Sequence, residues 1–277
     1  MKIKFLFASF FIVLIFTSCS HSKNDEAIVD PGNSIPTTYL PIASANYWKY
    51  KVSSQGTDTN DILTVGSDAT INAIVYKKMI GTADPSGVAT GFYSTTLNNN
   101  NLRIDGSSLK LTGSINYQLP VLTTPITINL SDFPIFKQNA TTGEILGSIS
   151  GSTSQTVNSL PLTFDYTLRS EGGENLSTFT SDGVIYNNIK KSKLILNVKI
   201  TTTQIISGVP NPITVVLMDA QDVATSTLHY ANNRGMVYNN TLINYNINPS
   251  VASFLPAGFP LIGNGSQDEY LTSSHVN

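Results

Sequence analysis

The sequence predicts an all-β domain that is assembled from antiparallel hairpins, with essentially no helix after the N-terminal segment. After Leu40, apolar and polar residues alternate with period two through most of the chain, as in strands that bury one face. Strong helix formers are scarce, whereas the β-branched residues Thr, Ile and Val are abundant. No amphipathic helical pattern is found after residue 20. These observations favour strands and turns throughout the folded part.

The N-terminus carries the features of a bacterial export signal. Lys2 and Lys4 form a short positive region, and the uncharged stretch Phe5–Phe16 follows it. This stretch is too short for a helix that spans a bilayer, which needs roughly 20 apolar residues. Its length and the small residues behind it are typical of a signal peptide, which we predict over residues 1–18.

The segment Phe16-Thr17-Ser18-Cys19 resembles the lipobox of bacterial lipoproteins, although Phe16 replaces the commoner Leu. The resemblance implies that the chain is cut before Cys19, that Cys19 carries fatty acyl groups such as palmitate, and that this lipid anchors the protein in the outer membrane. Cys19 is the only cysteine, so the domain can form no intramolecular disulfide. The alternative is a chance cysteine behind an ordinary signal peptide.

A polar segment separates the predicted anchor from the folded domain. Residues 19–40 have no apolar periodicity, so we expect a flexible tether there and a single β domain over residues 41–277. Within the tether, the run Lys23-Asn24-Asp25-Glu26 resembles the acidic surface-export signal of Bacteroidota lipoproteins. The resemblance implies that Lys23, Asp25 and Glu26 direct the protein to the cell surface. The alternative is a solvated linker on a protein that faces the periplasm.

The first strands of the domain are predicted between residues 46 and 104. The segment 46–52 alternates and places Trp48, Tyr50 and Val52 on one face. Further strands are predicted over residues 61–65, 70–79, 92–97 and 102–104. The four asparagines at 98–101 predict a hairpin turn, because Asn tolerates positive φ and bonds to its own backbone.

The middle and the C-terminal end of the domain are less regular. We expect a loop-rich region from about residue 113 to residue 160, in which a strand covers 124–130 and the Gly/Ser/Thr-rich run 143–154 forms a loop. A strand is predicted over 161–168. The tail from residue 248 contains three prolines and is expected to be irregular.

The clearest predicted strand covers residues 193–205. Its side chains Leu194, Leu196, Val198 and Ile200 share one face and form an apolar wall. A turn at 209–212 returns the chain through a strand over 213–218, and strands over 222–230 and 235–247 form another pair. The wall is either covered by a packed core, or it lines a hollow that takes an apolar ligand.

Two motifs resemble known envelope proteins. The segment Asn46-Tyr47-Trp48-Lys49-Tyr50, with Leu40-Pro41-Ile42 before it, resembles the N-Y-W-x-Y opening strand of a large group of Bacteroidota lipoproteins of unknown activity. The segments 180–193 and 230–237 resemble the lipoprotein-carrier half-barrels, in which a Y-A-x-x-x-G-x-V turn closes a long hairpin. The resemblance implies a strongly curved antiparallel sheet (half-barrel, barrel-like or sandwich), concave around apolar contents in the carriers. It implies no activity.

No residue pattern identifies a reaction. The net charge of −2 and the lack of basic runs argue against nucleic-acid binding. His229 lies in a predicted strand, where we expect a structural role. The run Asp58–Asp61 lacks the glycine and distal glutamate of a calcium loop, and neither a nucleophile elbow nor a zinc-spaced histidine pair is present. We therefore expect no catalytic residue, no cofactor and no metal.

Three roles remain open for the domain. The favoured hypothesis is a non-enzymatic binding or structural module of the cell envelope. The second is a carrier of a lipid or acyl chain, which requires a connected apolar cavity. The third is a glycan-binding surface protein that uses Trp48, Tyr47 and Tyr50 as a stacking platform, although Trp48 and Tyr50 share their face with Val52 and are better explained as core.

Replacing Cys19 with Ala removes the sulphur that the lipobox resemblance implies is acylated. We expect the variant to lose labelling by radioactive palmitate in cells and to leave the membrane fraction. Ser18→Ala is the matched control, because it alters the neighbouring residue and keeps the thiol. Undiminished palmitate incorporation by Cys19→Ala would contradict the predicted anchor.

Overall fold

Antiparallel hairpins build one continuous 13-stranded sheet in the described part of the chain. The computed structural model describes residues 38–119, 122, 124–204, 211–255 and 258–277, which belong to one compact unit. The strands are β1 (Tyr47–Ser54), β2 (Thr57–Ile71), β3 (Ile74–Ala83), β4 (Asn101–Asp105), β5 (Ser108–Tyr117), β6 (Ile126–Lys137), β7 (Ile145–Val157), β8 (Leu160–Gly172), β9 (Leu176–Ser181), β10 (Val184–Gln204), β11 (Ile213–Ala231), β12 (Gly235–Asn246) and β13 (Ile262–His275). An α-helix, α1 (Phe92–Leu97), follows β3, and a 3-10 helix, η1 (Pro249–Phe254), precedes β13.

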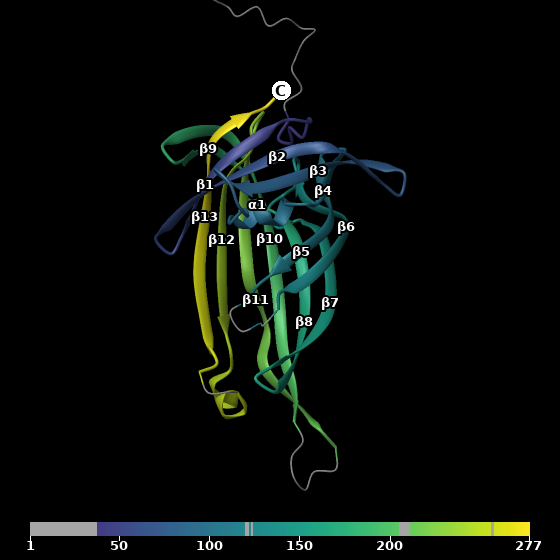
Figure 1. Cartoon of the computed structure of the whole chain (residues 1–277), viewed down its shortest axis with the longest axis vertical. Coiled ribbons are helices and arrows are strands. Elements are labelled where there is room, and N and C mark those ends of the chain that lie inside the picture. The colour runs from purple at the N-terminus through teal and green to yellow at the C-terminus, as the bar shows by residue number, and fades with distance from the viewer. Residues whose placement is uncertain (1–37, 120–121, 123, 205–210, 256–257) are drawn as a thin grey trace, which may run out of the picture. The chain divides into compact units, whose positions relative to one another are not determined.

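The strand order places the last strand beside the first. The order is β6-β5-β4-β3-β2-β1-β13-β12-β11-β10-β8-β7, with β9 paired to β10 outside this path. The sheet curves into a nearly closed, barrel-like shape (Figure 1). The predicted all-β class with a strongly curved antiparallel sheet is therefore confirmed.

Side chains, rather than a backbone ladder, bring the two ends of the strand order together. Among the described residues, β6 and β7 share no ladder. Instead, the hydroxyl groups of Ser170 in β8 and Ser192 in β10 donate hydrogen bonds to the carbonyl oxygens of Pro134 and Ile135 in β6. Both serines are completely buried, so these bonds join β6 to the inner face of the opposite strands.

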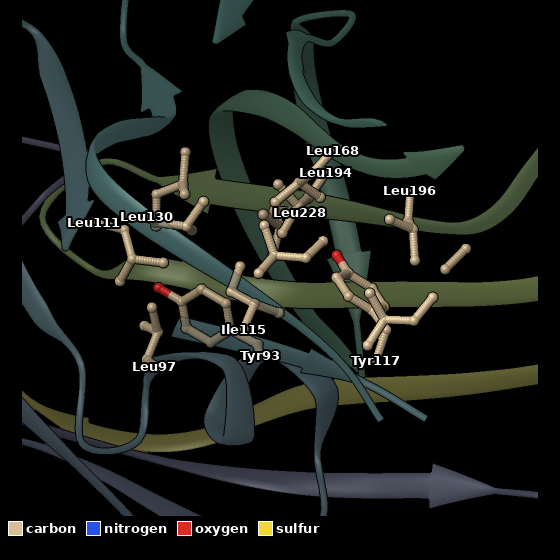
Figure 2. Close-up of a cluster of buried hydrophobic side chains, with 14 of the residues drawn as sticks. Tyr93, Leu97, Leu111, Ile115, Tyr117, Leu130, Leu168, Leu194, Leu196 and Leu228 are labelled. Carbon is tan, nitrogen blue, oxygen red and sulfur yellow. The ribbon is translucent and has the colours of Figure 1, made fainter. Parts of the chain in front are cut away.

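The interior of the sheet is filled with apolar side chains. Leu194, Leu196, Val198 and Ile200 of the predicted wall all belong to this core and are at most 3% exposed. Figure 2 shows Leu194 and Leu196 among side chains that come from α1, β5 and β6. The four side chains therefore share one buried face, and packed residues cover it. This favours the filled-core alternative over an apolar hollow.

The first strand is anchored by its aromatic face. Trp48, Tyr50 and Val52 are buried, as the alternation of β1 predicts. The indole Nε1 of Trp48 donates a hydrogen bond of 2.6 Å to the carbonyl oxygen of Arg234, and the hydroxyl of Tyr50 donates one of 3.1 Å to that of Met236. These bonds tie β1 to the turn between β11 and β12, and they confirm the core interpretation of Trp48.

The prediction of a strand over residues 92–97 was wrong, since these residues form α1. Aromatic and β-branched residues at this position favour a strand locally. The helix forms because its first backbone N–H groups find acceptors on β2 and β13, which are distant in sequence. Asn98–Asn101 accordingly leads from α1 into β4 rather than joining two strands, although Asn99 does adopt a positive φ of 61°.

The loop predicted over residues 143–154 was also wrong, because most of it lies in β7. Its glycines are required by close packing and not by flexibility. A Cβ atom on Gly147 would lie 2.9 Å from Cδ of Pro134, and one on Gly151 would lie 2.4 Å from the hydroxyl oxygen of Tyr166. The middle of the domain is therefore mostly β5, β6 and β7 rather than rich in loops.

The irregular tail expected from residue 248 contains the central strand β13. Its sequence shows little alternation, but its backbone pairs with β12 on one side and with β1 on the other. Ladder bonds therefore specify this strand where side-chain pattern does not. The predicted strands over 213–218 and 222–230 are likewise one strand, β11, whose register shifts at bulges opposite β10.

Placing a carboxylate at Val198 tests how tightly the wall is covered. An unpaired charge buried there should destabilise the domain by about 3–5 kcal/mol. Thr203→Asp, at an exposed position of the same strand, is the matched control and should leave stability nearly unchanged. Urea unfolding followed by the fluorescence of Trp48, the only tryptophan, measures both. Equal unfolding midpoints for the two variants would show that Val198 does not face a packed core.

Candidate functional site

A buried carboxylate on β2 holds the beginning of α1 inside the barrel-like sheet. The side chain of Asp61 is completely buried. It accepts hydrogen bonds from the backbone N–H of Thr90 at 3.0 Å and of Gly91 at 2.7 Å. The first N–H groups of a helix have no partner within the helix. When the start of a helix is buried, these groups therefore need hydrogen-bond acceptors from other parts of the chain.

Two side chains of β13 complete this cap. The amide oxygen of Gln267 accepts from the backbone N–H of Phe92 at 2.6 Å. Glu269 accepts from the N–H of Tyr93 at 2.6 Å and from that of Ser94 at 3.3 Å. The start of α1 is thus bound by three side chains from two strands that are adjacent to β1 on either side.

Glu269 is the most strongly perturbed carboxyl group near α1. Glu269 is 0% exposed, and this burial raises the pKa of its carboxyl group to about 7. The hydrogen bonds from Tyr93, Asn239 and Ser94 act in the opposite direction, and the charge of Asp61 raises the pKa further. Asn239 extends the contact to a buried hydroxyl group on β11, since its amide oxygen accepts from Ser226.

The close approach of the two carboxyl groups requires a glycine at position 91. A Cβ atom on Gly91 would lie 2.1 Å from Oε2 of Glu269 and 3.0 Å from Oδ2 of Asp61. Any side chain there would have to displace one of the two carboxyl groups. The glycine therefore allows both acids to reach the same turn of backbone.

An open cavity of about 360 Å³ lies beside this cap. It is bounded by α1, by β12 and β13, by the turn between β1 and β2, and by the residue after β5. We call it the α1 cavity. Its lining is Ser54, Gln55, Thr90, Phe92, Thr95, Gln118, Thr241, Ile243, Gly265, Ser266 and Gln267.

The α1 cavity opens where β13 loses one of its neighbours. β1 pairs with β13 only from Gln267 to His275, whereas β12 continues the pairing down to Ile262. Residues 262–266 thus have a ladder partner on one side alone among the described residues. The sheet is open along this part of β13, and the lining residues Gln55, Thr95 and Gln118 are reached by solvent.

The α1 cavity is lined by no titratable side chain, and apolar atoms contribute more of its exposed wall than polar atoms do. Most lining residues carry an amide or hydroxyl group, while Phe92, Ile243 and the carbon atoms of the other residues supply the apolar surface. Several polar groups already have internal partners: the Gln118 amide donates to backbone carbonyls, and the Thr241 hydroxyl bonds to Ser226. Such a surface can exchange neutral hydrogen bonds with a ligand, but it offers no proton transfer and no charge.

The structure brings the predicted site residues to different places. The wall residues of β10 lie in the core and do not line the α1 cavity. Cys19, Lys23, Asp25 and Glu26 fall outside the described residues, so the acylation and export assignments stay predictions. His229 is mostly buried on β11 and stacks on Phe179 with ring centroids 4.4 Å apart.

The cap and the α1 cavity were not found by sequence reasoning. Asp61 was placed at the start of a predicted strand and in a run that fails as a calcium loop, and Glu269 was placed in an irregular tail. A usable signal was the spacing of Glu269 and Leu271, which puts an acid on the same strand face as an apolar residue if the segment is a strand. An acid in such a position needs a buried partner, but the sequence does not tell which one.

Comparisons with known proteins find solved structures that are similar to this one at low TM-score and low sequence identity. No protein-family model and no curated protein matches this sequence. The structure is similar to that of a candidate exported protein with a YmcC-like fold from Bacteroides fragilis NCTC 9343, with a TM-score of 0.40, 8% identity, and coverage of 86% of this chain and 99% of that one. It is also similar to a candidate lipoprotein from Parabacteroides distasonis ATCC 8503, with a TM-score of 0.38, 11% identity and the same coverage.

Two searches of the described residues are negative. No group of three or more His, Cys, Asp or Glu residues in these ranges could hold a metal ion. Within the same ranges, no helix has both the length and the apolar character needed to cross a membrane.

Replacing Glu269 with Gln should flatten the pH dependence of stability. The pKa of Glu269 rises from 4.5 to about 7 on folding. The protonated side chain therefore contributes to the free energy of unfolding below pH 4.5, and this contribution is lost as the pH rises to about 7. This difference corresponds to roughly 3 kcal/mol. Relative to Glu269→Gln, the native protein should therefore lose stability between pH 4.5 and 7, as measured by urea unfolding.

The comparison with the variant is needed because His229 titrates in the same range with the opposite sign. Burial lowers the pKa of His229 from 6.5 to about 4, so the contribution of the neutral imidazole to stability is lost as the pH falls from 6.5 to about 4. The difference between native protein and Glu269→Gln cancels this effect. The exposed Glu174→Gln is the control and should leave the pH profile unchanged. Parallel profiles for the native protein and Glu269→Gln would contradict the raised pKa.

Proposed function

We propose that this protein is a lipid-anchored binding protein of the cell envelope, and that the α1 cavity binds a neutral saccharide. The anchor rests on the lipobox resemblance around Cys19. The observation that carries the ligand class is the lining of the cavity, which combines amide and hydroxyl groups with Phe92 and has no charged side chain.

The composition of the lining matches the chemistry of a sugar ring. Hydroxyl groups of a saccharide both donate and accept hydrogen bonds, as does the amide group of Gln55. The amide oxygen of Gln118 is a further acceptor, whereas both ends of the Gln267 amide already bond to the backbone of Phe92 and Thr90. The C–H face of a pyranose is apolar and can lie against the ring of Phe92. An anionic or cationic ligand would lose its hydration without gaining an ion pair, which is unfavourable.

The size of the α1 cavity is in the range of small-molecule sites, which are about 300–1,000 Å³. Its position also favours binding without catalysis. The two buried acids that cap α1, Asp61 and Glu269, bind its backbone and are not part of the lining. They therefore hold the wall of the cavity, and they do not present a carboxyl group to a ligand.

The carrier hypothesis has less support. An apolar ligand needs an apolar cavity, and the apolar pocket beside Trp48 and Tyr39 has a volume of only about 20 Å³. The wall of β10 that was considered for such a ligand is filled by core residues.

Filling the α1 cavity should abolish saccharide binding. We expect Ile243→Trp to lower the affinity for neutral oligosaccharides at least about tenfold, because the indole would occupy space that the ligand needs. Leu242→Trp is the matched control: it lies one residue away on the outer face of β12 and is 49% exposed. Isothermal titration with a panel of neutral oligosaccharides and uronic-acid oligosaccharides measures both variants.

Two outcomes would contradict the proposed ligand. One is the absence of binding to every neutral oligosaccharide in the panel, and the other is equal loss in Ile243→Trp and Leu242→Trp. A clear preference for the uronic acids would also be inconsistent with the uncharged lining.

A further inference from the structure

A second pocket lies at the opposite end of β13, where the chain enters the domain. It has a volume of about 180 Å³ and is lined by Val184, Tyr186, Arg234, Leu271 and residues 272–274. Unlike the α1 cavity, this pocket contains a guanidinium group. We call it the Arg234 pocket.

Arg234 differs from the other two arginines of the chain. Arg103 and Arg169 each form an ion pair of 2.7 Å with an aspartate, Asp132 and Asp222 respectively. Within the ranges that the structure describes, Arg234 has no ion pair. The guanidinium group of an arginine presents several hydrogen-bond donors that suit phosphate or carboxylate oxygens. An arginine without an ion pair that lines a pocket can therefore bind an oxyanion.

The backbone of Arg234 is held in place while its side chain stays free. Its carbonyl oxygen accepts the 2.6 Å bond from Trp48, and its N–H donates to Ala231 across the turn. Burial raises the pKa of Tyr186, and the positive charge of Arg234 opposes this rise. The guanidinium group therefore interacts electrostatically with the phenol of Tyr186. The nearby carboxylate of Asp182 is paired with Lys51 at 2.7 Å and leaves Arg234 unneutralised.

Two exposed aliphatic residues lie beside the Arg234 pocket, although most of its lining residues are polar. Val184, which lines the pocket, is 49% exposed, and its neighbour Ile185 is 66% exposed. Both lie at the tip of the hairpin of β9 and β10. A cationic pocket beside exposed aliphatic side chains matches an amphiphile, whose head group is anionic and whose chains are apolar.

The path of the chain indicates where such an amphiphile is found. Thr38 exchanges backbone and side-chain hydrogen bonds with Asn233, the residue before Arg234. Cys19, the proposed acylation site, lies only 19 residues earlier (38 minus 19). The proposed anchor therefore joins the domain at the end that carries the Arg234 pocket. In Figure 1, β9 and the C-terminus lie at one end of the domain.

We propose that the Arg234 pocket binds the phosphate group of an anionic membrane lipid, with Val184 and Ile185 entering the interfacial layer. Arg234 would bind the phosphate oxygens, and Tyr186, Ser273 and Ser274 would offer hydroxyl groups to the same head group. This inference rests on the proposed lipid anchor for the orientation of the domain, and it does not depend on saccharide binding. Docking would hold the open edge of β13 and the α1 cavity away from the membrane.

The test uses the mature chain, residues 19–277, with Cys19→Ser so that no acyl group contributes. Flotation should show binding to phosphatidylglycerol vesicles and weaker binding to phosphatidylcholine vesicles, whose phosphate is neutralised. In this background Arg234→Gln should lower the partition coefficient about fivefold. Ile185→Asn should lower it about tenfold, because an apolar side chain is removed from the interface.

Matched variants at the other end of the sheet control for charge and apolar area. Lys199→Gln removes one cation near the far end of β10, and Ile262→Asn removes an aliphatic side chain that is 67% exposed. Both should keep the native partition coefficient. Blue-shifted emission of Trp48 checks that Arg234→Gln is folded, since the indole bonds to that residue's carbonyl group.

Several results would overturn the inference. Equal binding by all four variants would mean that contact with vesicles is not made by this end. If inorganic phosphate alone raises the melting temperature of the native chain but not of Arg234→Gln, and no vesicle is bound, the pocket is a site for free phosphate and not for lipid. Saccharide titrations on the same preparations separate this failure from a failure of the proposed function.

Discussion

The architecture depends on the burial of two acids against the first turn of α1. Asp61 and Glu269 come from strands that flank β1, and together with Gln267 they accept the backbone N–H groups from Thr90 to Ser94. Without these acceptors the beginning of a six-residue helix would be buried with unsatisfied donors, each at a cost of about 1–3 kcal/mol. The cap therefore explains why a short helix can lie inside an otherwise all-β domain.

The position of α1 divides the interior of the barrel-like sheet into two kinds of space. On one side, Tyr93 and Leu97 point into the apolar core with Leu194 and Leu196, as Figure 2 shows. On the other side, Phe92 and Thr95 line the α1 cavity, where residues with amide and hydroxyl groups lie beside Ile243. The same helix thus completes the core and forms one wall of the candidate binding site.

The two ends of β13 border pockets of different chemistry. Near Ile262 the strand is unpaired on one side and borders an uncharged cavity, whereas near Ser274 it borders the pocket of Arg234. The first surface suits neutral polar ligands and the second suits an oxyanion. The two surfaces therefore lie near opposite ends of the same strand.

Side-chain alternation was sufficient to predict the class of the fold and its buried faces. Trp48, Tyr50 and Val52 on β1, and Leu194 to Ile200 on β10, are buried as the period-two pattern indicates, because a strand in a one-sided sheet must bury one face. The hairpin between β11 and β12 was also predicted, as the pair of strands over 222–230 and 235–247.

Tertiary contacts decided the parts in which local pattern was weak or misleading. Residues 92–97 became a helix because distant acceptors bind its N–H groups, and Gly147 and Gly151 stayed in a strand because Pro134 and Tyr166 pack against them. The polar strand β13 is specified by ladder bonds on both sides. The sequence by itself determined the all-β class and the buried strand faces, since these depend on the pattern within short segments, and the acylation of Cys19 is a prediction from the sequence alone. Only the tertiary structure decided the α1 cavity and the Arg234 pocket, because each joins side chains from segments that lie far apart in the chain.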